Sequence, residues 1–192
     1  MKKLLAIGAL SIAFAQAGVF VGVQGGYDVA AGYASGGKFN APLYDGRTNN
    51  SGWSVGANAG YELGLGFFGV RGYLQFDYSQ MLDVSRFHAF DVDFNVDALI
   101  NFVNSDAFGL GLYAGIGIGY QRLMYDLNVV QINSNNLPLF ARLGLTFKVL
   151  EHSRIDVGVK LPITGWNLDN RITDEFSIYS PLKAQISYKF LF

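Results

Sequence analysis

The chain has 192 residues, 51% of them hydrophobic and only 15% charged, with 24 glycines and a formal net charge of −1. It contains no cysteine, which excludes disulfide bonds and thiolate metal sites. No basic stripe or block of charge points to nucleic acid as a partner, and we expect neither a metal nor a cofactor.

Residues 1–17 have the pattern of a secretory signal peptide. Lys2 and Lys3 precede an uncharged apolar run, and Ala15 and Ala17 form an A-x-A cleavage site. We therefore expect residues 18–192 to be exported as one mature domain, because no Pro- or Ser-rich linker divides them.

The apolar residues of this domain are not gathered into a membrane-spanning helix. Such a helix needs about 18 consecutive apolar residues, and the uncharged run Ala107–Gln121 is too short and too rich in glycine. Apolar residues instead alternate with polar or small ones, a period of two that predicts strands with two different faces. The alternating segments are, in chain order, 19–29, 52–64, 68–78, 90–102, 108–120, 139–149, 155–163 and 182–192.

Segment 108–120 has a face made almost entirely of glycine. Its G-x-G-x-x-A match, like the G-x-G-x-x-G match at Gly64–Gly69, lacks the following helix that a dinucleotide-binding loop requires. We interpret the segment as a strand with one bare face, rather than as a nucleotide loop or a small-residue helix. The glycines of this face are Gly109, Gly111, Gly115, Gly117 and Gly119.

The connections between the segments alternate between long and short. Long connections are predicted at 30–51, 124–138 and 165–180, a modest one at 80–88, and short turns around Leu65, at 103–107 and at 151–153. Lipid offers no hydrogen-bond partner to an open sheet edge. The pattern therefore predicts an all-β fold, a closed antiparallel eight-stranded up-and-down transmembrane β-barrel, with periplasmic termini and extracellular long loops.

Aromatic residues lie near both ends of the apolar faces, as in the two interfacial girdles of such barrels. On the outer side these are Tyr27, Trp53, Tyr78 and Tyr120, and on the inner side Phe68, Phe102, Phe108, Phe147 and Phe190.

With these features the chain resembles the small eight-stranded outer-membrane β-barrel proteins of Gram-negative bacteria, the OmpA/OmpX/Ail-like group. The signal peptide and terminal phenylalanine are also similar to those of Helicobacter-type outer-membrane families. In the ending ISYKFLF, the residues Ile186, Tyr188, Phe190 and Phe192 look like the signal that the barrel-assembly machinery recognises. The resemblance implies integration in the outer membrane, with lipid, lipopolysaccharide and that machinery as partners.

The resemblance leaves the activity open, because such barrels include adhesins, anchors, small channels and lipid-modifying enzymes. Lipid A deacylases of this size use a His/Ser/Glu set, and His152 and Ser153 lie beside Glu151 on a predicted turn. A nucleophile needs its base within hydrogen-bond reach, whereas adjacent residues on a turn point apart. The turn is also predicted on the periplasmic side, away from outer-leaflet lipid A. We therefore expect no enzyme, with no catalytic residues, and keep lipid A modification as a minor alternative.

The inward faces carry charges of both signs in equal number. An eight-stranded barrel has an interior just wide enough to be filled by side chains, so these charges are predicted to form a buried ion-pair network. A narrow polar path or a small-ligand cavity is the alternative. The predicted network comprises Arg71, Asp77, Asp91, Asp93, Asp97, Arg142, Lys148, Asp156 and Lys160, and Glu62, Lys183 and Lys189 also face inward.

The glycine face is predicted to leave room for this network. A hairpin centred on Ser105 would place Asp93 opposite Gly117 and Asp91 opposite Gly119, and Arg142 on the next strand would reach across the glycines to these carboxylates.

We expect a structural or surface-interaction role, adhesin-like, with a host or surface ligand bound by the extracellular loops, because loops on a rigid scaffold are natural recognition sites. A narrow passive channel or small-ligand carrier is the first alternative.

Overall fold

A computed structural model describes residues 17–30, 33–35, 38–40, 51–82, 87–105, 107–127, 130–168 and 181–192. The expected signal peptide, with Ala15, lies outside these residues, and Ala17 is the first residue of the first strand. No helix in the described segments is long and apolar enough to cross a membrane.

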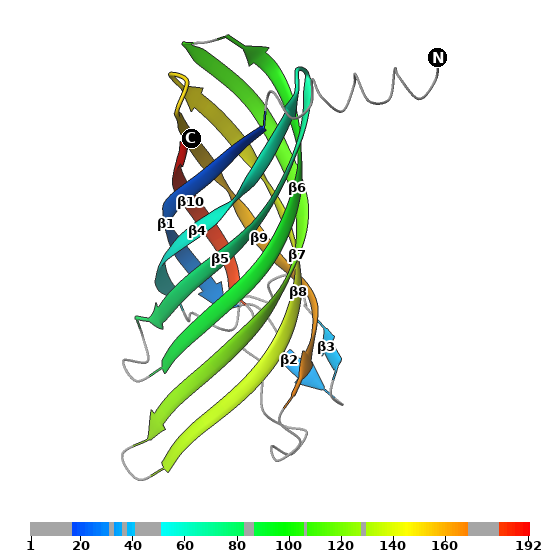
Figure 1. The fold of residues 1–192 in the computed structure, drawn as a ribbon. Coiled ribbons are helices and arrows are strands. Elements are labelled where there is room, and N and C mark those ends of the chain that lie inside the picture. Colours follow the sequence, from blue (N-terminus) through cyan, green and yellow to red (C-terminus); the bar gives the residue numbers. More distant parts are fainter. Residues whose placement is uncertain are drawn as a thin grey trace.

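Eight long strands form a closed antiparallel barrel (Figure 1). Each strand pairs with the next along the chain, and the last strand pairs with both its predecessor and the first, so the ring has no free edge. The expected fold class is confirmed. The eight strands are β1 (Ala17–Ala30), β4 (Ser51–Leu65), β5 (Phe68–Met81), β6 (Phe87–Asn104), β7 (Phe108–Leu127), β8 (Val130–Val149), β9 (Ser153–Asn167) and β10 (Pro181–Leu191).

Two further short strands lie in the first long connection. β2 (Tyr33–Ser35) pairs with β3 (Lys38–Asn40), and β3 joins the barrel sheet where Lys38 pairs with Trp166 of β9. Sequence alternation did not predict this small hairpin, because three residues are too few to display a period.

The two ends of the barrel differ. The short turns β4–β5, β6–β7 and β8–β9 lie at one end with the C-terminus, which we call the turn end, and we call the opposite end of the strands the loop end (Figure 1). In the first of these turns Gly66 has a φ of 77°, a left-handed conformation that glycine adopts without strain.

The β7–β8 hairpin differs from its expected form. Residues 124–138 were predicted to be a long connection, but β7 continues to Leu127 and β8 begins at Val130. Ladder pairing runs on to Leu127 opposite Val130, so this hairpin projects beyond the other strands at the loop end (Figure 1). The prediction was wrong because polar residues such as Asn133 and Ser134 hide the alternation while backbone pairing continues.

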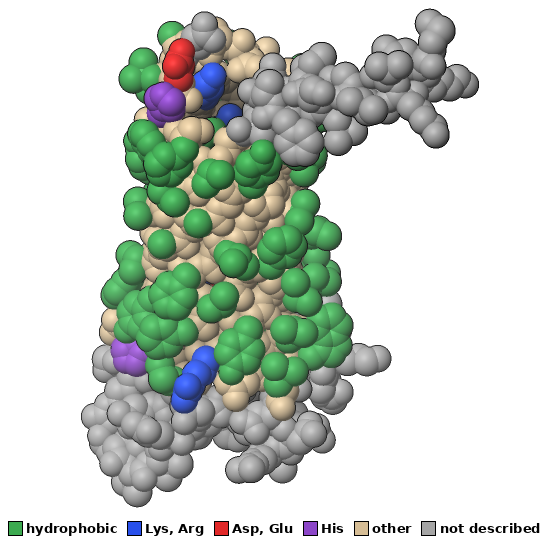
Figure 2. All heavy atoms as spheres, in the orientation of Figure 1, with side chains coloured by type: hydrophobic (Ala, Val, Ile, Leu, Met, Phe, Trp, Pro, Cys, Tyr) green, Lys and Arg blue, Asp and Glu red, His purple; other side chains and the backbone are tan. Residues whose placement is uncertain are grey.

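Burial follows the period of two. Throughout 91–100 every odd residue is buried and every even residue is exposed, so polar side chains line the lumen and apolar ones the outer wall. Figure 2 shows hydrophobic side chains spread over the wall on the face drawn, with charged ones only near its two ends. Exposed girdle residues include Tyr27, Trp53, Tyr120, Phe68, Phe102 and Phe108.

Candidate functional site

The lumen contains nearly all the charged side chains of the barrel strands, because alternation along each strand turns them inward. These residues are at most 7% exposed, so water screens their charges poorly and each needs a partner. The buried charged residues are Asp28, Glu62, Arg71, Asp77, Asp91, Asp93, Asp97, Arg142, Arg154, Asp156, Lys160, Lys183 and Lys189.

Arg71 is the centre of the largest ion-pair cluster. Its Nε lies 2.8 Å from Oδ2 of Asp97 and its Nη1 lies 2.7 Å from Oδ2 of Asp156, and all three side chains are almost completely buried. Asp156 also accepts a bond from Lys189. Because β5, β6, β9 and β10 supply these groups, the cluster spans the lumen between strands that are not neighbours.

Aromatic rings and a second arginine fill the same region. Arg142 donates from Nη1 to Oε1 of Gln75 at 2.7 Å, and its Cζ lies 5.1 Å from the ring centre of Tyr73. The Cζ of Arg71 lies 4.6 Å from the ring centre of Tyr113. A guanidinium over an aromatic face is attracted by the ring quadrupole. Together the two arginines and the two tyrosine rings form one packed layer across the lumen.

Two lysines carry the network toward the loop end. Lys160 pairs with Asp93, while Nζ of Lys183 lies 2.9 Å from Oδ2 of Asp91 and 3.6 Å from Oδ2 of Asp28. The same Nζ donates to Oγ of Ser79 at 2.8 Å. These contacts tie β9 and β10 to β6 across the barrel.

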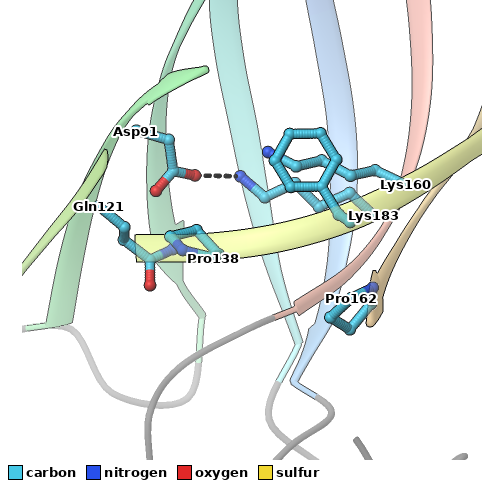
Figure 3. A pocket seen from close by; sticks show the side chains of 7 residues that line it. Asp91, Gln121, Pro138, Lys160, Pro162 and Lys183 are labelled. Atoms are coloured by element: carbon cyan, nitrogen blue, oxygen red, sulfur yellow. Dashed lines mark hydrogen bonds and ion pairs between the residues drawn. The ribbon is translucent and has the colours of Figure 1, made fainter. Parts of the chain in front are cut away.

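A small pocket of about 10 Å³, roughly the space of one water molecule, lies beside these lysines (Figure 3). Ionic and amide groups share its wall with apolar rings, and the Asp91–Lys183 ion pair closes one side. Its lining residues are Asp91, Gln121, Pro138, Phe140, Lys160, Pro162 and Lys183.

The turn end has a separate ion pair. Arg154 Nη2 lies 2.8 Å from Oε1 of Glu62. Lys148, predicted to join the network, lies opposite Arg154 in the β8–β9 register and is half-buried. No acidic partner within the described part of the chain lies at salt-bridge distance from Lys148.

Asp77 has no cation partner among the described residues but accepts bonds from Gln24 and, at 2.6 Å, from Nε2 of Gln75. Sequence reasoning missed two members of the ion pairs, Asp28 and Arg154. Asp28 follows Tyr27 on the polar face of segment 19–29, so the alternation contained its signal. Arg154 was missed because the predicted strand began at residue 155, whereas β9 begins at Ser153.

The glycine face lies inward as a set, but its expected register was wrong. Asp93 lies opposite Gly119, Asn95 opposite Gly117 and Asp97 opposite Gly115. Asn104 pairs with Gly109, whereas a turn centred on Ser105 would pair it with Asp106, so the register next to the turn is shifted by three residues. The bulge between Asn101 and Val103 adds one residue to β6 and reduces this shift to two. A Cβ atom added at any of the five glycines would lie close to atoms of β6 or β8. These glycines are Gly109, Gly111, Gly115, Gly117 and Gly119.

The expected partners of Arg142 were also wrong. Asp91 and Asp93 bind Lys183 and Lys160, whereas Arg142 donates to Gln75 and stacks on tyrosine rings. In the observed register, Asp93 pairs with a lysine of β9 and Asp91 with a lysine of β10.

The histidine and serine of the β8–β9 turn do not form a catalytic pair. His152 Nδ1 hydrogen bonds to the carbonyl of Leu191 at 2.9 Å, and Ser153 Oγ hydrogen bonds to the Tyr188 hydroxyl at 3.0 Å. No group of three His, Cys, Asp or Glu side chains in the described segments could hold a metal ion.

The model of a family described as Helicobacter outer membrane protein matches residues 56–192. No curated protein sequence matches significantly. Among solved structures, Neisserial surface protein A (NspA) is 14% identical with a TM-score of 0.55, covering 91% of this chain and 97% of its own. The N-terminal β-barrel domain of Pseudomonas aeruginosa OprF is 13% identical with a TM-score of 0.52, covering 90% and 97%. These likenesses show a shared fold.

Proposed function

The chain belongs to the Helicobacter outer membrane protein family and is an integral outer-membrane β-barrel, and from this premise we propose that it is a closed barrel that presents its loops for surface interaction. Its lumen serves stability rather than transport, and it catalyses no reaction. Oriented as we propose, the turn end faces the periplasm and the loop end faces outward, as in other barrels with short turns on one side.

The observation that carries the proposal is the Arg71 cluster. Arg71, Asp97 and Asp156 come from three different strands and meet inside the lumen with almost no exposure. A solute path through this layer would have to separate buried opposite charges, which is strongly unfavourable. A lumen sealed in this way leaves the connections at the loop end as the part of the molecule available for recognition.

Planar-bilayer recording of the refolded protein tests the closed lumen. Wild type is expected to show no discrete openings, and a variant that carries both Arg71→Ser and Arg142→Ser, which removes both guanidinium groups from the layer, is the positive control. Regular openings of the wild type would favour the passive channel instead.

Orientation and surface interaction need their own measurements. An epitope placed between β5 and β6 should be labelled by antibody on intact cells, and one placed at Glu151 should not. Cells that display the wild type should bind a host surface more strongly than cells whose β7–β8 hairpin is shortened beyond Gln121. Equal binding by both would contradict a role for this hairpin.

Mass spectrometry of lipid A tests the enzyme alternative. Because His152 and Ser153 hydrogen bond to separate partners, we expect identical lipid A acyl chains with and without the gene. A missing acyl chain that depends on Ser153 would overturn the non-enzymatic assignment.

A further inference from the structure

Arg122 differs from every other charged residue of the barrel strands whose side chain the structure describes. Those residues lie on the inward face, buried or half-buried, whereas Arg122 on β7 is exposed between the buried Gln121 and Leu123. It therefore points outward, on a wall that is otherwise apolar or uncharged. No carboxylate whose side chain the structure describes pairs with it.

The surroundings of Arg122 are polar on one side and aromatic on the other. Across the sheet it lies opposite Phe90 of β6 and Asn135 of β8. Tyr120, two residues before it on the same face, is 44% exposed and donates its hydroxyl to Oδ1 of Asn135 at 2.7 Å. That bond fixes the amide carbonyl and leaves the Asn135 NH₂ group as a second donor beside the guanidinium.

His88 adds a further polar group nearby. It lies opposite Met124 in the β6–β7 register, diagonal to Arg122, a spacing of roughly 7–8 Å between backbones. Its Nδ1 is hydrogen bonded to the Tyr78 hydroxyl at 2.6 Å. We call Arg122, Asn135, Tyr120 and His88 the Arg122 patch.

The depth of the patch matches a lipid headgroup. On β7 the outward residues from Phe108 to Tyr120 are all apolar or aromatic, and at the usual rise and tilt they span roughly 30 Å, the thickness of a bilayer core. Arg122 is one outward position further, about 5 Å beyond the edge of the hydrocarbon. Anionic phosphates of membrane lipids lie at this level.

We propose that the Arg122 patch binds a phosphate group of lipid A in the outer leaflet. A guanidinium offers paired donors that match phosphate oxygens, and Asn135 supplies a neutral donor at the rim. The assignment to the outer leaflet rests on the proposed orientation of the loop end; binding of a lipid phosphate by Arg122 does not.

Native mass spectrometry of refolded barrels in neutral detergent tests the proposal, with bisphosphorylated lipid A, dephosphorylated lipid A and phosphatidylglycerol as probes. Wild type should retain bisphosphorylated lipid A best. Arg122→Gln should weaken that retention about tenfold, and Arg122→Lys should restore part of it. Tyr27→Phe, at an exposed girdle position on β1, is the control and should behave as wild type.

Heat-modified gel migration would show that each variant is folded before it is scored. Equal retention by wild type and Arg122→Gln would overturn the site, as would equal retention of dephosphorylated lipid A. A preference for phosphatidylglycerol that depends on Arg122 would overturn the lipid A assignment, and the epitope experiment would then show whether the orientation is at fault. None of these results bears on whether the lumen is closed.

Discussion

Asp93 on β6 lies directly opposite Gly119 on β7, and its carboxylate occupies the space that a Cβ at position 119 would need. The same carboxylate binds Lys160, which comes from β9. The absence of a side chain on β7 thus allows β6 and β9 to be joined through the lumen.

Gly119→Ala is expected to destabilise the barrel by about 1–3 kcal/mol, because the new methyl group must displace the Asp93 carboxylate from its position beside Lys160. Equilibrium urea unfolding of the refolded protein measures this. Gly72→Ala is the matched control, since its Cβ would meet nothing nearer than a carbonyl at 4.0 Å. Equal unfolding midpoints for both variants would contradict the explanation.

Gly117→Leu is expected to be more damaging, since even a Cβ at 117 overlaps the ring of Phe140 and the amide of Asn95. Because one of these two obstacles is the ring of Phe140, adding Phe140→Ala should recover part of the lost free energy of unfolding. The double-mutant cycle in urea tests this. Strictly additive effects would show that Phe140 does not obstruct a side chain at position 117.

Arg71→Met should cost about 3–5 kcal/mol, because it leaves the buried carboxylate of Asp97 without a cation and removes one from Asp156. Adding Asp97→Asn should restore part of the loss by removing one uncompensated charge. Arg154→Met is the graded control: its pair with Glu62 is 8–9% exposed near the turn end, so a smaller loss is expected. A larger loss for Arg154→Met would contradict the central role of the Arg71 cluster.

Phe192 is expected to act in assembly rather than in the stability of the finished barrel. Residue Phe192 is 70% exposed, and its ring meets that of Phe190 edge-on, with ring centres 5.1 Å apart. Phe192→Ser should therefore leave the unfolding midpoint of refolded protein within about 0.5 kcal/mol of wild type while lowering the amount assembled in cells. Ile163→Ser, exposed on the wall, serves as the control for lost apolar area. Normal assembly of Phe192→Ser would remove this residue from the signal.

Segment 121–127 should exchange its amide hydrogens as slowly as paired strand rather than as a loop, because ladder pairing with β8 continues to Leu127. Hydrogen exchange followed by mass spectrometry compares peptides from this segment with a peptide around Ile118. Complete exchange of 121–127 at the first time point would support the long connection that the sequence suggested.

The barrel could be predicted from the sequence because the lipid outside and the polar lumen inside favour opposite kinds of side chain at neighbouring positions. Lipid outside and charge inside make Asp91, Val92 and Asp93 alternate without exception, and closure follows because lipid cannot satisfy an open edge. This alternation is lost where a strand no longer has a lipid-facing side. In the extended part of the β7–β8 hairpin, residues beyond the membrane do not face lipid. They are paired as strands, but their sequence shows no alternation of apolar residues.

The partners within the lumen could not be predicted in the same way. Which carboxylate meets which cation depends on register, and the position of the β6–β7 turn, only partly offset by the bulge at Asn101 and Val103, places Asp93 opposite Gly119 rather than Gly117. It also depends on contacts across the barrel, as between Lys183 and Asp91, which alternation along one strand does not contain.

β10 pairs on one side with β1 and on the other with β9, so Phe20 and Leu191 are partners although they lie near opposite ends of the chain. Until β10 is present, the remaining strands leave two unsatisfied edges. Contacts of such long sequence separation form late and slowly, and exposed edges invite aggregation while they wait. A chain shortened before residue 181 therefore lacks the one strand that completes the ring, and we expect it to be cleared as an unfolded client rather than to persist as a smaller barrel.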